Sequence, residues 1–437
     1  MRWQERAGKK LMSSDEAVAV VESGHCVTVA PFTSTPVTLC EALYRKRGEL
    51  RNVRIDHAAG LYSWVREGDG GSFEVHEIYG TAVNRDLVNR GRLEYLPLAV
   101  WRAGEVPAGF HPAPDVFLVA VSPPDARGFC SFGSGVWFSK LLSESAKTVI
   151  AEVHEDFIRS GGDNFVHLSR LDRICLAEPA PPPPIPPRNE EEAVNTEVIC
   201  RLVAAELVHD RDTLQIGIGT VSAALGIYLG DKHDLGIQTE LLTGGIATFL
   251  REGVITGKYK TLHTGKVVAS ACALLSQEEF AILDGHPAFE LYDFGYTDDV
   301  RFLVRQNNLM AINNALLVDL TGQIASETIG PRIWSGVGGQ LAFMIAAQYS
   351  PGGRSISVLP SSHVIGGKRV SRVVGALPEG TAVTVPRTLV DYVVTEQGIA
   401  SLRGKTVRER IGELVAVAHP DFRAELREQA KRLYGIG

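Results

Sequence analysis

Residues 235–253 read LGIQTELLTGGIATFLREG, and this stretch decides how the rest of the chain is interpreted. Residues 235–239 are typical of a short buried strand. Two glycines then interrupt the chain, and apolar residues recur at helical spacing until Gly253 ends a predicted helix. Glu240 therefore stands where a strand ends and a loop begins. In an open α/β sheet, this edge is where ligands bind.

The position of Glu240 allows three interpretations. A carboxylate at a strand end can be a nucleophile, a general base or a plain surface acid. Position alone favours the surface acid, because glutamate is common at strand ends. Other stretches of the chain decide between the three.

The composition indicates a soluble, two-domain protein. The chain has 437 residues, of which 45% are hydrophobic and 22% charged, and this length predicts two domains of roughly 150–250 residues each. A net charge of −7 argues against nucleic-acid binding. No apolar run approaches the ~20 residues that span a bilayer, and the polar N-terminus lacks an apolar signal core. We therefore expect a cytoplasmic protein without membrane association.

The cysteine pattern gives no sign of a metal site. The six cysteines are scattered and form no C-x-x-C pair, which excludes the usual zinc spacings and indicates reduced, mostly buried thiols. Cys272, on an apolar stretch, is interpreted as core rather than as a nucleophile. Histidines 263, 286 and 363 have no carboxylate or serine at a spacing typical of a catalytic pair. Each is therefore interpreted as a surface histidine or a hydrogen-bonded structural one rather than as a general base.

Strand and helix patterns alternate through the first half of the chain. Predicted strands cover 26–30, 53–55, 116–121 and 148–153, and such alternation builds a mostly parallel α/β sheet. Residues 179–192, PAPPPPIPPRNEEE, form one low-complexity segment, which favours an extended polyproline spacer. We therefore expect an N-terminal domain over 1–178, a linker over 179–192 and a C-terminal domain over 193–437, in which 193–207 is a helix.

Two glycine-rich segments of the second half are candidates for binding. In residues 214–220, LQIGIGT, a strand runs into Gly-x-Gly before a helix, where backbone N–H groups can approach a phosphate or a pantetheine amide. The third glycine of the dinucleotide fingerprint is missing, since Ser222 occupies its place, so a nicotinamide cofactor is poorly supported. Residues 335–340, SGVGGQ, precede an apolar helix and are suited to an oxyanion or a thioester carbonyl.

Residues 257–266, GKYKTLHTGK, are rich in basic side chains. The plain interpretation is a basic surface turn before the predicted strand 267–273. The alternative is a positive patch for an anionic, phosphate-bearing ligand.

Seven stretches, taken together and in order, resemble the acetyl-CoA hydrolase/transferase family. They are VSPPDARGFCSFG, LQIGIGT, GIQTELLTGG, EGVITGKYKTLHTGK, SGVGGQLAF, DYVVTEQGIASLRGK and AHPDFR, and the resemblance runs from about residue 13 to about residue 426. This family includes the 4-hydroxybutyrate, butyrate:acetate and succinyl-CoA:acetate CoA-transferases. The likeness is greatest to the shorter, 4-hydroxybutyrate type.

The resemblance implies a fold and a reaction. The fold would be two open, mostly parallel α/β CoA-transferase domains of similar topology, facing each other across a central cleft. The reaction would move CoA between an acyl-CoA, such as acetyl-CoA or another short-chain acyl-CoA, and a free short carboxylic acid such as acetate. It would be a ping-pong reaction through a glutamyl-CoA thioester, with coenzyme A as substrate and covalent intermediate and no bound cofactor or metal. A homodimer is the expected assembly.

The resemblance also implies roles for individual residues. Glu240 would be the nucleophile, and Gly338 and Gly339 would hold the thioester oxygen. Asp298 falls where relatives place an Asn or Asp beside the acyl group. The residues implied to contact CoA are Gln215, Ile216, Gly217, Ile218, Gly219, Ser335 and Lys368.

The chain departs from the family pattern at Ala342, where relatives carry an acid in a GGQxDF pattern. Two alternatives to a transferase stay open. The first is a hydrolase, in which water intercepts the anhydride or thioester formed on Glu240. The second is a non-catalytic CoA-binding protein, which Ala342 alone suggests.

Overall fold

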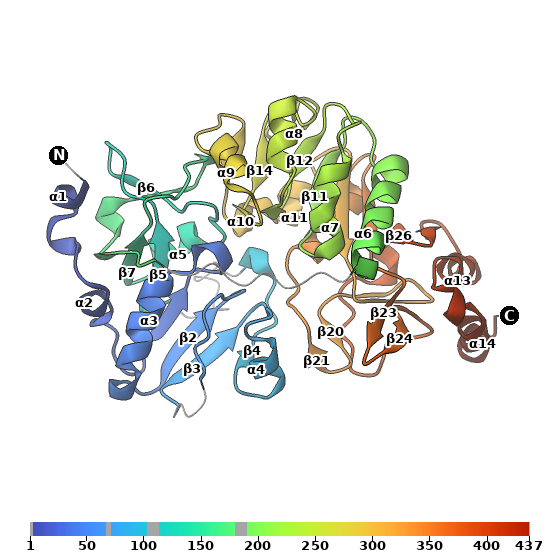
Figure 1. The fold of residues 1–437 in the computed structure, drawn as a ribbon, viewed down its shortest axis with the longest axis horizontal. Helices are drawn as coiled ribbons and strands as arrows, with labels where there is room; N and C mark the ends of the chain where they lie inside the picture. The colour runs from blue at the N-terminus through green and yellow to red at the C-terminus, as the bar shows by residue number, and fades with distance from the viewer. Residues whose placement is uncertain (1–2, 67–70, 103–112, 180–189, 437) are drawn as a thin grey trace. The chain divides into compact units, whose positions relative to one another are not determined.

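The computed structural model describes residues 3–66, 71–102, 113–179 and 190–436. The chain forms two compact units (Figure 1). The first comprises Met1–Pro184 together with the later segments Val268–Ala273 and Phe280–Thr297, and the second comprises the remainder. Residues 180–189, most of the expected linker, lie outside the described residues. The domain boundaries of the sequence analysis stay a prediction, and the structure adds two segments of the second half to the first unit.

The first unit is built on a seven-stranded sheet in the order β10-β7-β5-β1-β2-β3-β4. All the neighbouring strands run parallel. The inner strand β5, next to the central strand β1, is buried along its whole length, as in sheets covered on both faces. The strands are β1 (Cys26–Val29), β2 (Val53–His57), β3 (Phe73–Glu77), β4 (Glu94–Tyr95), β5 (Val116–Val121), β7 (Thr148–Val153) and β10 (Arg173–Leu176).

Short helices and strand pairs complete the first unit. A capping box between Ser13 and Glu16 begins helix α2, which packs against α3 and carries part of the apolar core. The helices are α1 (Trp3–Ala7), α2 (Ser14–Val18), α3 (Val37–Arg45), α4 (Arg85–Asn89), α5 (Ser139–Ser145) and α10 (Phe294–Thr297). The further strands are β6 (Phe129–Ser131), β8 (Gly161–Gly162), β9 (Phe165–His167), β15 (Ala271–Cys272) and β16 (Phe289–Leu291). Strand β14 (Val267–Ala269) and helix α9 (Gln277–Leu283) cross the boundaries between segments.

The second unit repeats the winding of the first. Its strands lie in the order β27-β26-β22-β17-β11-β12, and all pairs are parallel except β26 with β27. In both units the first strand is central, the strands that follow it directly in the chain lie on one side of it, and the later strands lie on the other side. The strands are β11 (Thr213–Ile216), β12 (Gly236–Gln238), β17 (Leu309–Asn314), β22 (Arg354–Val358), β26 (Tyr392–Thr395) and β27 (Gly398–Ser401).

Helices cover this second sheet, with α12 packed on β17 and β22, and α6 lying beside α7 (Figure 1). The helices are α6 (Glu190–Leu202), α7 (Thr220–Leu225), α8 (Ile246–Glu252), α11 (Val300–Leu303), α12 (Gln340–Tyr349), α13 (Val407–Ala416) and α14 (Arg423–Tyr434). The short strands are β13 (Leu241–Leu242), β18 (Leu317–Asp319), β19 (Ile324–Ala325), β20 (Thr328–Ile329), β21 (Arg332–Ile333), β23 (Ser362–Ile365), β24 (Lys368–Ser371) and β25 (Val373–Val374).

The α/β class, the mostly parallel sheets and the individual strands at 116–121 and 148–153 are confirmed. The helix expected over 193–207 begins earlier, at Glu190, and ends in a π-helical turn, Val203–Leu207. No helix in the described part of the chain is long and apolar enough to cross a membrane.

Candidate active site

Glu240 lies between strands β12 and β13, where the chain leaves the carboxyl edge of the second sheet. The preceding Thr239 is buried, and its hydroxyl bonds the carbonyl of Ile216 at 3.2 Å and that of Leu241 at 3.2 Å. Thr239 Oγ1 also accepts from the N–H of Ile216 at 3.3 Å. The backbone on either side of Glu240 is therefore fixed to the end of β11.

The carboxylate of Glu240 meets the glycine turn that begins α12. The backbone N–H of Gly339 donates to Glu240 Oε2 at 2.7 Å. A Cβ placed on Gly339 would lie 2.5 Å from Glu240 Oε2 and 2.3 Å from Asp298 Oδ2. Only a glycine permits both carboxylates to approach the backbone this closely. The preceding Gly338 has φ +56°, a conformation that L side chains rarely adopt.

The surroundings of Glu240 alter its acidity. Burial raises the pKa of the Glu240 carboxyl to about 7, and the hydrogen bond from Gly339 acts in the opposite direction. The neighbouring Asp298 is fully buried. A glutamate with this pKa is substantially ionised at neutral pH, as a nucleophile must be, and is less stabilised by water than a surface acid.

Residues 215–219 run from the end of strand β11 into the loop that follows it, as predicted, but the side chain of Gln215 is turned inward. Gln215 is buried, and its amide exchanges two hydrogen bonds with Asn313, at 3.1 and 2.7 Å. Its side chain thus supports the loop that Ile216, Gly217, Ile218 and Gly219 lead into. The side chain of Ile218 is 40% exposed.

Ser335 and Lys368 lie in different settings. The Ser335 hydroxyl donates to the carbonyl of Ser326 at 3.1 Å, close to the glycine turn. Lys368 is exposed at the tip of the β23–β24 hairpin. Within the described part of the chain, no hydrogen bond joins Lys368 to the other candidate residues.

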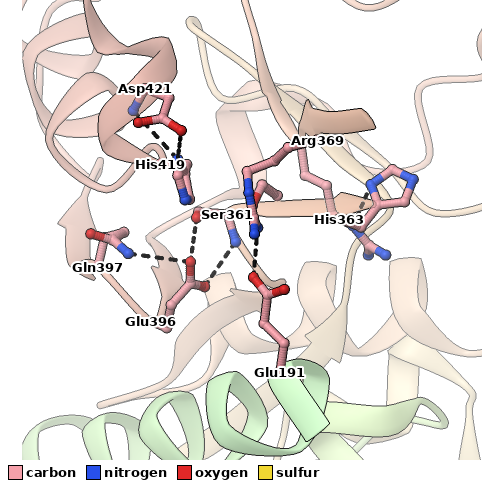
Figure 2. Close-up of polar contacts among 10 residues, drawn as sticks. Glu191, Ser361, His363, Arg369, Glu396, Gln397, His419 and Asp421 are labelled. Carbon is pink, nitrogen blue, oxygen red and sulfur yellow. Dashed lines mark hydrogen bonds and ion pairs between the residues drawn. The ribbon is translucent and has the colours of Figure 1, made fainter. Parts of the chain in front are cut away.

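Polar contacts hold this hairpin both at its base and along β24 (Figure 2). Arg369 pairs with Glu191 in the first turn of α6 at 2.6 Å, and Glu396 accepts the N–H of Ser361 at 2.8 Å. These contacts fix where the hairpin leaves the unit.

The basic segment 257–266 differs from both interpretations of the sequence at one position. Lys260 is only 3% exposed, and its ammonium donates to the carbonyls of Ile237 at 2.6 Å and Lys266 at 2.9 Å. Lys260 is therefore neither a surface cation nor placed for a phosphate, and it ties the segment to strand β12. Cys272 is fully buried, in agreement with its interpretation as core.

Two residues that support the site were not singled out from the sequence. Asn313 and Asn314 end strand β17 and contact the loop that follows β11. The signal was an Asn-Asn pair closing an apolar run, and polar residues at the carboxyl end of a parallel strand are well placed for function.

Two family models match the chain. The acetyl-CoA hydrolase/transferase N-terminal domain matches residues 1–186, and the C-terminal domain of the same family matches residues 276–430. The 4-hydroxybutyrate coenzyme A transferase of Clostridium kluyveri is 36% identical over 441 residues, covering 99% of this chain and 100% of that protein.

Two solved structures have the same fold over the whole chain. RipA from Yersinia pestis superposes with a TM-score of 0.89 at 31% identity and 100% coverage of both chains. The 4-hydroxybutyrate CoA-transferase of Porphyromonas gingivalis superposes with a TM-score of 0.78 at 33% identity, covering 99% of this chain and 100% of that one. Two of these full-length relatives are named as CoA-transferases, and the chain therefore belongs to the acetyl-CoA hydrolase/transferase family.

Proposed function

We propose that the protein is an acyl-CoA:carboxylate CoA-transferase that works through a glutamyl-CoA thioester on Glu240. The observation that carries the proposal is the hydrogen bond from the Gly339 N–H to the Glu240 carboxylate at 2.7 Å. The reaction requires a carboxylate as nucleophile, and this hydrogen bond pairs the carboxylate at the end of β12 with the backbone donor at the start of α12. The same donor is suited to the oxyanion that forms when Glu240 becomes an acyl centre.

The first half of the reaction transfers CoA to the enzyme. The Glu240 carboxylate attacks the carbonyl carbon of the acyl-CoA, and the collapse of the tetrahedral intermediate expels CoA thiolate and leaves an acyl-glutamyl anhydride. The thiolate then attacks the glutamyl carbonyl of this anhydride. The bond between the glutamyl carbonyl carbon and the bridging oxygen breaks, the acyl group departs as a free carboxylate, and glutamyl-CoA remains.

The second half reverses these steps with a new acid. The incoming carboxylate attacks glutamyl-CoA and releases the thiolate, which attacks the acyl carbonyl of the new anhydride and regenerates the Glu240 carboxylate. No proton is consumed, and the energy of the thioester is retained throughout, so the steps require neither ATP nor a metal. One backbone donor to each oxyanion contributes ~2.7–4 kcal/mol in other enzymes.

The substrates that we propose are short. The Clostridium kluyveri relative is named for 4-hydroxybutyrate, and this name supports acetyl-CoA or another short-chain acyl-CoA as donor and a short carboxylic acid, with acetate as the first candidate, as acceptor. The loop over 215–219, Ser335 and Lys368 are proposed to contact CoA, and Asp298 to lie beside the acyl group. A homodimer stays a prediction.

The direct test is to trap the intermediate. Incubating the protein with acetyl-CoA and no acceptor acid should attach CoA to the chain, since glutamyl-CoA waits for an acid that is absent. Mass spectrometry of the digested protein should map the adduct to the peptide that contains Glu240. In a separate assay with acetate present, the protein should convert another acyl-CoA into acetyl-CoA.

Variants at Glu240 separate the nucleophile from the rest of the site. Glu240→Ala should abolish both adduct and transfer, and Glu240→Asp should lower transfer by about 100-fold, because misplacing a reacting group by ~1 Å costs this much. Glu252→Ala, an exposed glutamate at the end of α8, is the matched control and should retain full activity. Transfer that survives in Glu240→Ala would contradict the proposal. Steady release of free CoA without transfer would indicate a hydrolase, and binding without either product a non-catalytic protein.

A further inference from the structure

The asparagine pair Asn313–Asn314 ends strand β17 where the winding of the second sheet changes direction. The chain passes from β11 to β12 on one side and then returns to β17 on the other side of β11. In open α/β sheets, ligands bind at such a point, outside the carboxyl ends of the two strands. The loop segment 215–219 begins at the end of one of these strands, and the asparagine pair closes the other.

Asn313 holds the start of that loop. Its side chain forms the reciprocal amide pair with Gln215, and both residues are buried. It also fills the space beside Gly217, where an added Cβ would lie 2.3 Å from Asn313 Oδ1. A buried amide that loses its partner is costly, so the pair specifies one position of the loop relative to β17.

Asn314 contacts the loop after β11 through its side chain, and Gln340 and Ser326 through its backbone carbonyl. Its side-chain amide donates to the carbonyl of Ile218 at 3.3 Å and lies against Gly219, where a Cβ would come within 2.1 Å of Asn314 Nδ2. Its backbone carbonyl accepts from the side chain of Gln340 at 3.4 Å and from the hydroxyl of Ser326 at 3.1 Å.

These contacts join the two parts of the proposed site. Gln340 directly follows Gly339, whose N–H binds the Glu240 carboxylate. Ser326 in turn accepts a hydrogen bond from Ser335, which precedes the same glycine turn. One short segment, Asn313–Asn314, therefore contacts both the loop after β11 and the residues that flank the turn at Gly339.

We propose that Asn313 and Asn314 are positioning residues that couple the loop over 215–219 to the Gly339 turn. A CoA thioester held by the loop is thereby kept in reach of the Glu240 carboxylate. This inference rests on the proposed function for the identity of the ligand. The asparagines touch neither reacting group, and their effect on the reaction is exerted through the two backbone segments that they hold.

A double-mutant cycle tests the coupling. Asn314→Ala removes the contact to the loop, and Gln340→Leu removes the contact to the turn. Each single variant should lower kcat/KM for acetyl-CoA by about 10- to 100-fold through misplacement of the thioester. The double variant should lose about as much kcat/KM as the more damaging of the two single variants, because the second substitution removes a connection that the first has already broken. The separate kcat and KM values, and the affinity for CoA measured by calorimetry, are recorded with the melting temperature of each protein.

Independent losses that multiply in the double variant would overturn the inference, as would an unchanged kcat/KM in a folded Asn314→Ala protein. If Asn314→Ala does not fold, Asn314→Ser, which keeps a short donor, takes its place in the cycle. Asn307→Ala is the matched control: Asn307 is exposed, its hydrogen bonds in the described structure come from its backbone, and the variant should behave as wild type. A wild-type protein that binds CoA but transfers nothing would refute the proposed function alone. The coupling would then be read from the CoA affinities, which must show the same non-additivity.

Discussion

The carboxylate of Glu240 has to be ionised to attack, yet its surroundings favour the protonated form. Burial raises its pKa to about 7, well above the ordinary value for glutamate. The backbone N–H of Gly339 offsets part of this effect at 2.7 Å. The result is a carboxylate that is reactive near neutral pH and only weakly solvated.

This balance predicts a pH dependence. Only the ionised form attacks, so the rate of CoA attachment to Glu240 should rise as the pH rises through about 7. The increase between pH 6 and pH 8 should be about tenfold, with a plateau above. Single-turnover mixing with acetyl-CoA, quenched and analysed by mass, measures it. A rate that is already constant above pH 5 would show a solvated carboxylate.

The place of Glu240 at a sheet edge could be predicted from the local sequence, whereas its approach to Gly339 could not. A strand pattern followed by Glu and two glycines places the residue at a sheet edge, because strand ends are local features. Gly339 lies 99 residues further along the chain. Its approach to Glu240 depends on how the sheet is wound, and no local periodicity encodes that. The resemblance to a family supplied the connection instead.

At the scale of elements, the decisive feature is the glycine turn that begins α12. Gly339 has φ −84°, which any residue can adopt, so its backbone conformation does not require glycine. The requirement comes from space, since a Cβ would meet oxygens of both Asp298 and Glu240. Glycine is therefore required at position 339 because the carboxylates of Asp298 and Glu240 approach the backbone there.

Gly339→Val should consequently lower transfer by at least about 100-fold while the protein stays folded, because the Glu240 carboxylate must move away from its donor. Gly412→Val is the control: a Cβ at Gly412 in α13 would meet nothing within 4 Å. Steady-state transfer rates and circular dichroism of both variants provide the comparison. Wild-type rates in a folded Gly339→Val protein would remove the turn from the mechanism.

Elements with strong local patterns were predictable, and elements shaped by tertiary contacts were not. Strand β5 is apolar at every position, and α8 ends at a glycine with φ +79°, so both could be placed from sequence. From the sequence, Lys260 is expected at the surface, because nothing in the neighbouring sequence indicates that this lysine is buried. Backbone carbonyls brought close by the fold make its burial tolerable. Ala342 is fully buried on α12, which local pattern alone also does not reveal.

At the scale of the whole molecule, several buried ionisable groups link stability to pH. Burial raises the pKa of Glu77 to about 8 and the pKa of Asp293 to about 7, as it does for Glu240. Each acid binds its proton more tightly in the folded chain, so its contribution is lost as pH rises through the folded value. Burial lowers the pKa of His57 to about 4, so its contribution is present above its ordinary value and is lost as pH falls through about 4.

The melting temperature should therefore decrease, by on the order of 5 °C, when the pH is raised from 6 to 8.5. Glu77→Gln should flatten this dependence, because an amide stays neutral and its oxygen still accepts the N–H groups of Ala59 and Tyr79. Glu74→Gln, on the same strand but exposed, should leave the slope unchanged. Scanning calorimetry across the pH range measures all three proteins. Equal slopes for the two variants would remove Glu77 from the account.

The first unit draws two of its segments, Val268–Ala273 and Phe280–Thr297, from the second half of the chain. On a ribosome this arrangement imposes a delay. Translation proceeds at roughly 5–20 residues per second, so residues 185–297 take roughly 6–23 s to appear after the rest of the first unit has been made. During that interval the nascent unit lacks the segments that complete it, and its apolar surface is open to chaperones. The order of synthesis thus makes the early part of the chain wait for two segments that are made after Glu240 before it can finish folding.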